Sequence, residues 1–285
     1  MFPTEFAYHR ASSVQDAIAF LGANPDAKVL AGGHSLIPAM KLRLAMPGAL
    51  VDLGRIDALR EIAVGPAGAK IGAMATYNEI RDNDAIARAY PILPEAIANV
   101  GDAQVRERGT FGGSLAHADP AADLTAVFLA LDGEVAVTGP NGDRTIGADD
   151  FFVDLWTTTL EPEEIITSVN RPAPPAKNGM GYEKHAHPAS GYAVVGIAVV
   201  LGFGDGGNCD SARVAVTGAT SKATRLTGVE DALTGQKLTP ELIASAAANA
   251  ADGLEINGDL YASEKYRAHL VNVMTRRALT RAAGV

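Results

Sequence analysis

Cysteine is almost absent from this chain of 285 residues, which contains only Cys209. A single cysteine cannot form a disulfide within the chain. It also cannot supply the thiolates of an iron–sulfur cluster or of a Cys₄ zinc site. Redox chemistry in this protein must therefore come from a bound cofactor.

Positive charge and long apolar runs are also scarce. Lys and Arg number 24 against 33 Asp and Glu, a formal net charge of −9, which disfavours a nucleic-acid backbone or an anionic membrane as partner. The longest apolar stretch, residues 193–203, contains glycines and is too short to cross a bilayer. The first residues lack the basic and apolar regions of a signal peptide. We therefore expect a soluble, cytoplasmic protein that binds no nucleic acid.

The residues that are present are typical of a folded α+β protein, with 47% hydrophobic and 20% charged residues. Residues 1–55 are predicted to form a compact β-loop-α-β unit. Its strands span 28–31 and 49–53 and enclose a helix at 35–44. A further helix at 13–23 precedes them, with Ser12 or Ser13 as its cap.

The second region, residues 56–173, alternates strands and helices. A long glycine-bearing stretch, 101–120, separates two of the helices, and we expect it to be a functional loop, since long loops in compact domains tend to be functional. The predicted strands are 69–73, 134–138 and 165–170, and the predicted helices are 77–82, 94–100 and 121–131.

A proline-rich linker at 171–176 leads into a third region, residues 178–285. Three strands followed by three helices predict an α+β domain with a three-stranded antiparallel sheet. Gly202–Gly207 matches G-x-G-x-x-G but lies between two strands, so we interpret it as a hairpin and not as a dinucleotide fingerprint. The strands are 180–184, 192–201 and 212–217, and the helices are 222–233, 239–251 and 261–281.

The first candidate site is the turn at residues 30–36, Leu-Ala-Gly-Gly-His-Ser-Leu, where a predicted strand passes into a predicted helix. Glycines let the backbone approach a ligand closely, and the free N–H groups at a helix start favour an anion such as a pyrophosphate. Ser35 is placed to cap the helix or to bind phosphate, and an ordinary tight turn is the alternative. A nucleophilic role is disfavoured because Ile37 stands where a G-x-S-x-G elbow needs glycine.

The second candidate site is the glycine loop at residues 109–123. Asp119 is suited to cap the helix predicted from 121, and Pro120 is suited to its first turn. Asp123 lies one turn further on, where a carboxylate fits a ribose hydroxyl. A capped loop without a ligand is again the alternative, although two such loops in one chain favour a dinucleotide.

Histidines provide a possible metal site, but the spacing does not support one. His185 and His187 are close in sequence, and His117 with Asp119 could join them. Structural and catalytic metal sites need three or four ligands, usually at characteristic spacings that this chain lacks. We therefore predict solvated or capping histidines and no metal site.

The two glycine loops, in this order and roughly 75 residues apart, resemble the FAD-binding medium subunit of molybdenum hydroxylases, the group of bacterial carbon monoxide dehydrogenase and xanthine dehydrogenase. Residues 31–38 resemble the first FAD loop of that family. Residues 110–114 resemble the second, where Ile and Asn are commoner than Phe111 and Ser114. The resemblance covers essentially the whole chain and includes the runs 118–123, 181–184 and 190–193.

The resemblance implies a fold and a set of cofactor contacts. The fold is a PCMH-type FAD-binding domain of two subdomains, 1–55 and 56–173, followed by a C-terminal α+β domain at 178–285. The first loop would hold the pyrophosphate, the second loop the flavin side and ribityl chain, and Asp123 the adenosine ribose, while Leu160, Lys184 and Tyr192 would lie by the isoalloxazine. The residues implied in FAD binding are Val29, Leu30, Ala31, Gly32, Gly33, His34, Ser35, Leu36, Ile37, Thr110, Gly112, Gly113, Ser114, His117, Asp123, Leu160, Lys184 and Tyr192.

The same resemblance implies a function as an electron-transfer subunit. A small subunit would carry the [2Fe–2S] clusters and a large subunit the molybdopterin cofactor. The FAD would pass electrons to an acceptor such as a quinone, O₂ or NAD, in an assembly that is commonly a dimer of heterotrimers. Two alternatives stay open, namely a stand-alone FAD oxidoreductase with its own substrate and a non-catalytic nucleotide-binding subunit.

Overall fold

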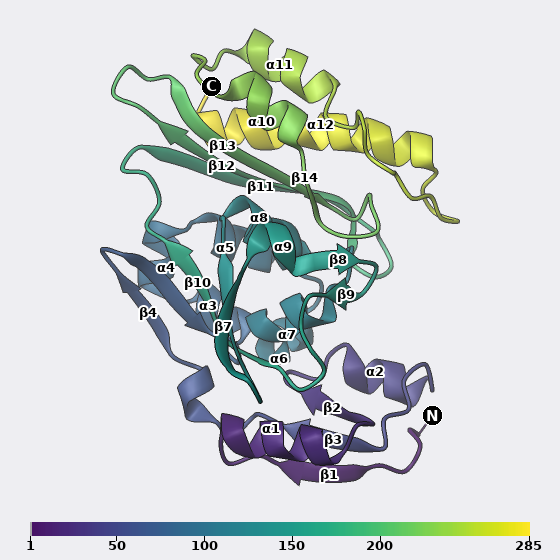
Figure 1. Cartoon of the computed structure of the whole chain (residues 1–285). Helices are drawn as coiled ribbons and strands as arrows, with labels where there is room; N and C mark the ends of the chain where they lie inside the picture. The colour runs from purple at the N-terminus through teal and green to yellow at the C-terminus, as the bar shows by residue number, and fades with distance from the viewer. Residues whose placement is uncertain (1) are drawn as a thin grey trace.

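The computed structural model describes residues 2–285, which form three successive layers from the N-terminus to the C-terminus (Figure 1). The first layer is a parallel sheet of order β1-β3-β2, with α1 packed beside it. Ser13 caps α1 by accepting a hydrogen bond from the Asp16 N–H, as one of the two sequence alternatives predicted. The elements are β1 (Ala7–Arg10), α1 (Val14–Ala23), β2 (Ala27–Leu30), α2 (Leu36–Lys41), β3 (Ala49–Asp52) and the 3₁₀ turn η1 (Asp57–Leu59).

The middle layer is an antiparallel sheet of order β4-β5-β10-β6-β7 with seven α-helices around it. Every residue of α8 is buried, as expected for a helix that is apolar on all sides. It packs against α5 on one side and against β12 and β13 of the last layer on the other, so it joins the two layers. The elements are β4 (Ile62–Gly65), β5 (Gly68–Gly72), α3 (Tyr77–Arg81), α4 (Asp84–Ala89), α5 (Ile92–Ala98), α6 (Ala103–Arg108), α7 (Phe111–His117), α8 (Asp123–Ala130), β6 (Glu134–Gly139), β7 (Gly142–Gly147), α9 (Ala148–Phe151), β8 (Phe152–Asp154), β9 (Thr157–Thr158) and β10 (Ile165–Pro172).

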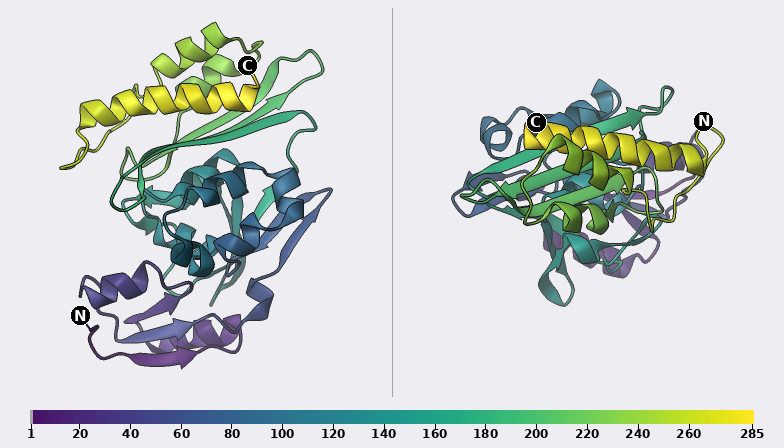
Figure 2. Two further views of the ribbon diagram at one scale, coloured as in Figure 1. Left: turned by 180° about the vertical axis from the view of Figure 1, so that it is seen from behind. Right: turned by 90° about the horizontal axis from the view of Figure 1, so that it is seen from above.

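The last layer is an antiparallel sheet covered by helices on its outer face. Figure 2 shows α12 lying across this sheet, with α10 and α11 beside it. The ten residues 193–202 of β12 are all buried, because α8 covers the inner face of the same sheet. The elements are β11 (Asn178–Ala186), β12 (Ala193–Phe203), β13 (Cys209–Thr217), β14 (Thr224–Arg225), α10 (Thr227–Leu233), α11 (Pro240–Ala248) and α12 (Glu264–Ala283).

The structure confirms the α+β class and the antiparallel C-terminal sheet, to which it adds the short strand β14. The glycine run 202–207 connects β12 and β13 as a hairpin, as the sequence indicated. The domain boundaries at 55, 173 and 178 stay a prediction. Among the described residues, no helix has both the length and the apolar character that crossing a membrane requires.

Several predicted elements were wrong in extent or kind. The stretch 101–120 is not one long loop, because α6 and α7 form within it. The helix predicted from 121 begins at Asp123, the one predicted from 222 begins at Thr227, and α2 ends at Lys41. Short helices such as α6 and α7 gain little stability from their own sequence and depend on tertiary packing, which local patterns do not report.

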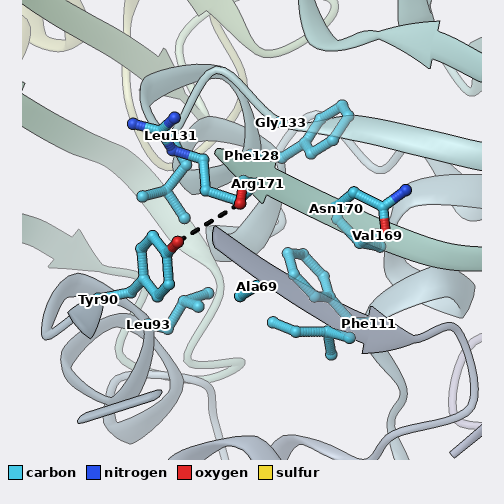
Figure 3. Close-up of a pocket in the computed structure, with 11 residues that line it drawn as sticks. Ala69, Tyr90, Leu93, Phe111, Phe128, Leu131, Gly133, Val169, Asn170 and Arg171 are labelled. Atoms are coloured by element: carbon cyan, nitrogen blue, oxygen red, sulfur yellow. Dashed lines mark hydrogen bonds between the residues drawn. The ribbon is translucent and has the colours of Figure 1, made fainter. Parts of the chain in front are cut away.

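A small apolar cavity lies in the core of the middle layer, between β5, β10 and α5 (Figure 3). Its volume is about 10 Å³, barely enough for one water molecule. The Tyr90 hydroxyl at its edge donates to the Pro172 carbonyl at 3.0 Å. This cavity is a packing defect of the core and is too small for a cofactor.

Candidate functional site

The first glycine loop presents a row of unpaired backbone donors. The N–H groups of residues 32–36 find no hydrogen-bond acceptor among the described residues, and residues 31–37 are all half-buried. Gly33 has φ of +78°, a left-handed conformation that favours glycine. Ser35 is the residue that precedes α2. Free N–H groups at the start of a helix favour an anion, and the Ser35 side chain beside them makes no capping hydrogen bond.

The second glycine loop forms the first turn of α7. Thr110 caps this helix, since its Oγ1 accepts from the Gly113 N–H at 3.2 Å. The other N–H groups of the turn are also used, so this loop has no row of free donors. Phe111 donates to Ala75 O at 3.2 Å, Gly112 to Ala73 O at 2.9 Å, and Ser114 to Thr110 O at 3.0 Å.

The two loops touch each other. A Cβ atom on Gly32 would lie 2.1 Å from the Arg108 carbonyl oxygen, and one on Gly113 would lie 3.3 Å from the Ala31 Cβ. Glycine is therefore required for the loops to approach. A groove of about 440 Å³ adjoins this contact. Its lining residues are Ala31, Gly32, Gly54, Arg60, Met74, Thr76, Asn78, Glu79, Asp82, Glu107, Arg108 and Thr110.

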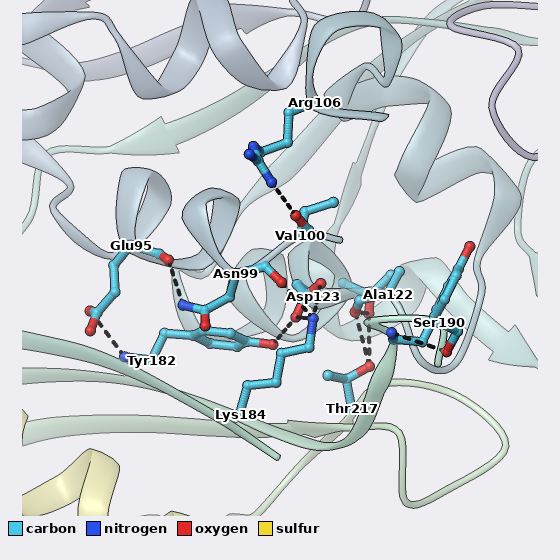
Figure 4. A network of polar contacts seen from close by, with 12 residues as sticks. Glu95, Asn99, Val100, Arg106, Ala122, Asp123, Tyr182, Lys184, Ser190 and Thr217 are labelled. Carbon is cyan, nitrogen blue, oxygen red and sulfur yellow. Dashed lines mark hydrogen bonds and ion pairs between the residues drawn. The ribbon is translucent and has the colours of Figure 1, made fainter. Parts of the chain in front are cut away.

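Asp123 lies at the start of α8 in a buried polar network (Figure 4). Its carboxylate accepts from the Tyr182 hydroxyl at 2.5 Å and from Lys184 Nζ at 2.9 Å. Lys184 Nζ also donates to the Asn99 carbonyl at 2.8 Å, and its side chain is 1% exposed. Burial raises the pKa of Asp123, while the Lys184 ammonium opposes that rise. The network ties α5 and α8 to β11, and the role of Asp123 toward a ribose stays a prediction.

Sequence reasoning assigned no role to Tyr182, although a signal for it was present. Tyr182 and Lys184 are two residues apart on β11, so their side chains point to the same face of the strand. Burial raises the pKa of Tyr182 well above its ordinary value, and the Asp123 carboxylate adds to this rise. Tyr182 therefore remains a neutral hydrogen-bond donor to Asp123.

Tyr77 is a second residue that the sequence did not single out. It is buried behind the second loop, and its N–H donates to Gly109 O at 2.9 Å. Burial raises the pKa of its phenol to about 12, while the nearby Ser114 side chain opposes the rise. Through its N–H, Tyr77 thus supports the start of the second loop at Gly109.

Tyr192 lies in the turn between β11 and β12 and is 45% exposed. The turn is closed by hydrogen bonds of 2.8 Å from the His187 N–H to Tyr192 O and from the Gly191 N–H to His187 O. Burial of part of the ring raises the pKa of Tyr192, and Asp119 and Asp123 add to the rise. Tyr192 is therefore an accessible aromatic ring on a fixed turn, near the end of the second loop.

The remaining predicted residues lie at the margins of this arrangement. His117 is exposed at the end of α7, and Leu160 is half-buried against the core of the middle layer.

Asp119 does not cap α8 as predicted, because its carboxylate instead accepts from the Ala121 N–H at 2.9 Å and closes a turn before the helix. The His187 ring packs against the Tyr261 ring in a tilted arrangement, with ring centroids 4.3 Å apart. Among residues 2–285, no group of three or more His, Cys, Asp or Glu side chains could hold a metal ion.

The residues present fit a dinucleotide. Residues 32–36 supply unpaired donors for a pyrophosphate, and Gly32 and Gly33 keep Cβ atoms out of its way. Thr110 and Ser114 supply hydroxyl groups beside it, and Tyr192 supplies an exposed ring for an aromatic system. Composition alone could not have indicated this arrangement, because it depends on the contact between the two loops.

Comparisons with known proteins cover essentially the whole chain. Residues 4–174 match the model of the FAD binding domain in molybdopterin dehydrogenase, and residues 181–282 match that of the CO dehydrogenase flavoprotein C-terminal domain. The nicotine 6-hydroxylase medium subunit of Paenarthrobacter nicotinovorans is 38% identical, with 96% of each chain covered. The carbon monoxide dehydrogenase medium chain of Hydrogenophaga pseudoflava is 38% identical, with 99% of this chain and 98% of that chain covered.

Solved structures give the same result. Carbon monoxide dehydrogenase from Hydrogenophaga pseudoflava superposes with a TM-score of 0.96 at 39% identity, covering 100% of this chain and 99% of that one. Quinoline 2-oxidoreductase from Pseudomonas putida 86 superposes with a TM-score of 0.93 at 33% identity and the same coverage. The chain therefore belongs to the family of FAD-binding medium subunits of molybdenum hydroxylases, as an oxidoreductase flavoprotein component.

Proposed function

We propose that this chain is the electron outlet of a molybdenum hydroxylase, receiving electrons from iron–sulfur clusters of a partner and passing them to an external acceptor. The observation that carries the proposal is the row of five N–H groups at residues 32–36 that have no acceptor within residues 2–285, placed against the second glycine loop by the close approach of Gly32 to Arg108. This row suits the pyrophosphate that joins the two halves of FAD.

Each predicted contact residue receives a role in this proposal. Residues 29–37 bind the pyrophosphate, and Thr110 to Ser114 with His117 bind the flavin side and ribityl chain. Asp123 faces the ribose, while Leu160, Lys184 and Tyr192 lie by the isoalloxazine, with Lys184 also paired to Asp123. When bound, the flavin exchanges electrons singly or in pairs, and the protein supplies orientation and electrostatics.

The partners follow from what the chain lacks. Its one cysteine, Cys209, is fully buried in the C-terminal layer, so the clusters must lie in another subunit. We propose a small [2Fe–2S] subunit and a large molybdopterin subunit, assembled as a dimer of heterotrimers in the cytoplasm. The substrate binds and is oxidised at the large subunit, and the electron acceptor is a quinone, O₂, NAD or a similar oxidant.

The test is to purify the protein with its native partners and to measure its visible spectrum, its molybdenum and its iron. Flavin absorption, both metals and two co-purifying chains are expected, and the flavin should bleach when a substrate of the large subunit is added. Flavin that a small molecule bleaches in the isolated chain would favour a stand-alone oxidoreductase. Flavin that stays oxidised in the complex would favour a non-catalytic subunit, and a folded complex without flavin would overturn the proposal.

A further inference from the structure

The segment between α7 and α8, residues 118–122 of the second glycine loop, leads to Asp123, and its backbone is held from outside the middle layer. The Pro120 carbonyl accepts two hydrogen bonds from the end of β13: from Thr217 Oγ1 at 2.5 Å and from the Gly218 N–H at 2.6 Å. The Ala193 N–H of β12 donates to the next carbonyl, Ala121 O, at 3.3 Å. Three donors from the C-terminal layer therefore fix this connecting segment.

The hydroxyl of Thr217 is committed to this task. Thr217 is fully buried, and its hydroxyl lies within hydrogen-bond distance of two carbonyls of the segment, Pro120 O at 2.5 Å and Ala122 O at 2.9 Å. The Ala122 carbonyl also accepts from the Thr125 hydroxyl at 2.7 Å, so Pro120 O depends more on Thr217 than Ala122 O does. Removing the Thr217 hydroxyl would thus leave the segment with the Gly218 N–H as the one donor to Pro120 O.

Arg267 of α12 fixes the same turn from behind. Its guanidinium donates to the Val194 carbonyl at 2.9 Å and to the Gly218 carbonyl, and it pairs with Asp259. Gly218 has φ of +85°, and a Cβ there would lie 2.5 Å from Ala193 O, so the turn is tightly packed. A continuous path of hydrogen bonds therefore runs from α12 through the Gly218 turn to Pro120.

We propose that Thr217 and Arg267 are positioning residues for the flavin site: the C-terminal layer sets the place of residues 118–122 and thereby of Asp123 and the end of α7. This inference rests on the proposed binding of FAD. Neither residue lies in either glycine loop, and their action passes through backbone carbonyls. The C-terminal layer then affects FAD affinity and the flavin midpoint potential in addition to covering the core of the middle layer.

The test compares Thr217→Val with Thr275→Val in the assembled complex. Thr275 is also fully buried, and its hydroxyl has no hydrogen-bond partner among the described residues, so it is a matched control. We expect Thr217→Val to raise the dissociation constant of FAD about three- to tenfold and to change the flavin midpoint potential and visible circular dichroism. Thr217→Ser should restore all three, and Thr275→Val should leave them unchanged.

Wild-type FAD affinity and flavin potential in Thr217→Val would overturn the inference. A loss of thermal stability with no change in flavin potential or dichroism would also overturn it, since that result assigns a structural role only. If Thr217→Val does not assemble, Asp259→Asn at the half-exposed partner of Arg267 decides, with an expected weakening of FAD binding of about twofold. Wild-type complex that binds no FAD would refute the proposed function instead, so the two failures are distinguishable.

Discussion

The two glycine loops look alike in sequence but differ in how their backbones are used. Both place two glycines and a hydroxyl residue at the start of a helix. In the first loop the N–H groups of residues 32–36 have no acceptor in the part of the chain that the structure describes, and Ser35 makes no cap. In the second loop residues 111–114 all donate within the protein, and Thr110 is a cap.

This difference separates a binding loop from a supporting loop. A helix start can leave its donors free for an anion or satisfy them with neighbouring carbonyls, and it cannot do both. The glycines of the second loop permit close packing, since a Cβ on Gly112 would lie 2.8 Å from the Ala73 carbonyl oxygen. The second loop can therefore contact a cofactor mainly through side chains such as those of Thr110 and Ser114.

The largest effect is expected at Lys184, which pairs with Asp123 at the end of the second, supporting loop. Lys184→Met would leave the buried Asp123 carboxylate without its counter-charge, and we expect a loss of about 3–5 kcal/mol in the free energy of unfolding without FAD. Denaturant titration of the apoprotein measures it. Lys177→Met, at an exposed pair with Asp205, is the control and should change almost nothing. Equal losses in the two variants would mean that the buried network around Asp123 does not stabilise the apoprotein.

The contact between the loops gives the next effect. Gly32→Ala would force a methyl group against the Arg108 carbonyl and separate the loops, which should cost about 3 kcal/mol and strongly reduce the FAD content. Gly228→Ala is the matched control, because a Cβ there meets no atom and alanine suits the helix α10. Flavin content and thermal unfolding of both variants measure the difference. Full flavin occupancy in Gly32→Ala would show that the loops need not touch.

Alkaline pH tests the burial of Tyr77 behind the second loop. The pKa of Tyr77 is raised to about 12 from an ordinary value of 10.0. The contribution of this phenol to the free energy of unfolding is therefore complete below pH 10 and is lost as the pH rises toward 12, because the phenol of the unfolded chain ionises first. In Tyr77→Phe this loss, about 2 kcal/mol, should be missing. Free energies of unfolding from pH 9 to 12 in both proteins measure it. Parallel curves would contradict the assignment.

The smallest effects compare the two hydroxyl residues directly. Thr110→Val removes a helix cap and should cost about 1 kcal/mol of apoprotein stability. Ser35→Ala removes no internal hydrogen bond, so apoprotein stability should change by less than about 0.5 kcal/mol while FAD binding weakens. Apoprotein unfolding and FAD titration of both variants test this. The comparison between the loops fails if Ser35→Ala destabilises the apoprotein as much as Thr110→Val does.

Much of the fold was predictable because its patterns are local. The strands of the C-terminal sheet and the helix α12 follow from periodicity, and the hairpin at 202–207 follows from glycine between two strands. The stretch 101–120 was not predictable in the same way. Its helices α6 and α7 are short and are held by carbonyls of residues 73 and 75 and by the other loop, which are distant in sequence.

The sequence by itself determined that the redox group must be bound, since one cysteine cannot hold a cluster, and it located both glycine loops and the residues that resemble an FAD site. Only the tertiary structure decided which loop keeps its donors free, which groups surround Asp123, and that Thr217 holds the segment beside it. The physical reason is that a turn's sequence sets which conformations are allowed. Whether its polar groups are satisfied depends on carbonyls and side chains that the fold brings from elsewhere in the chain.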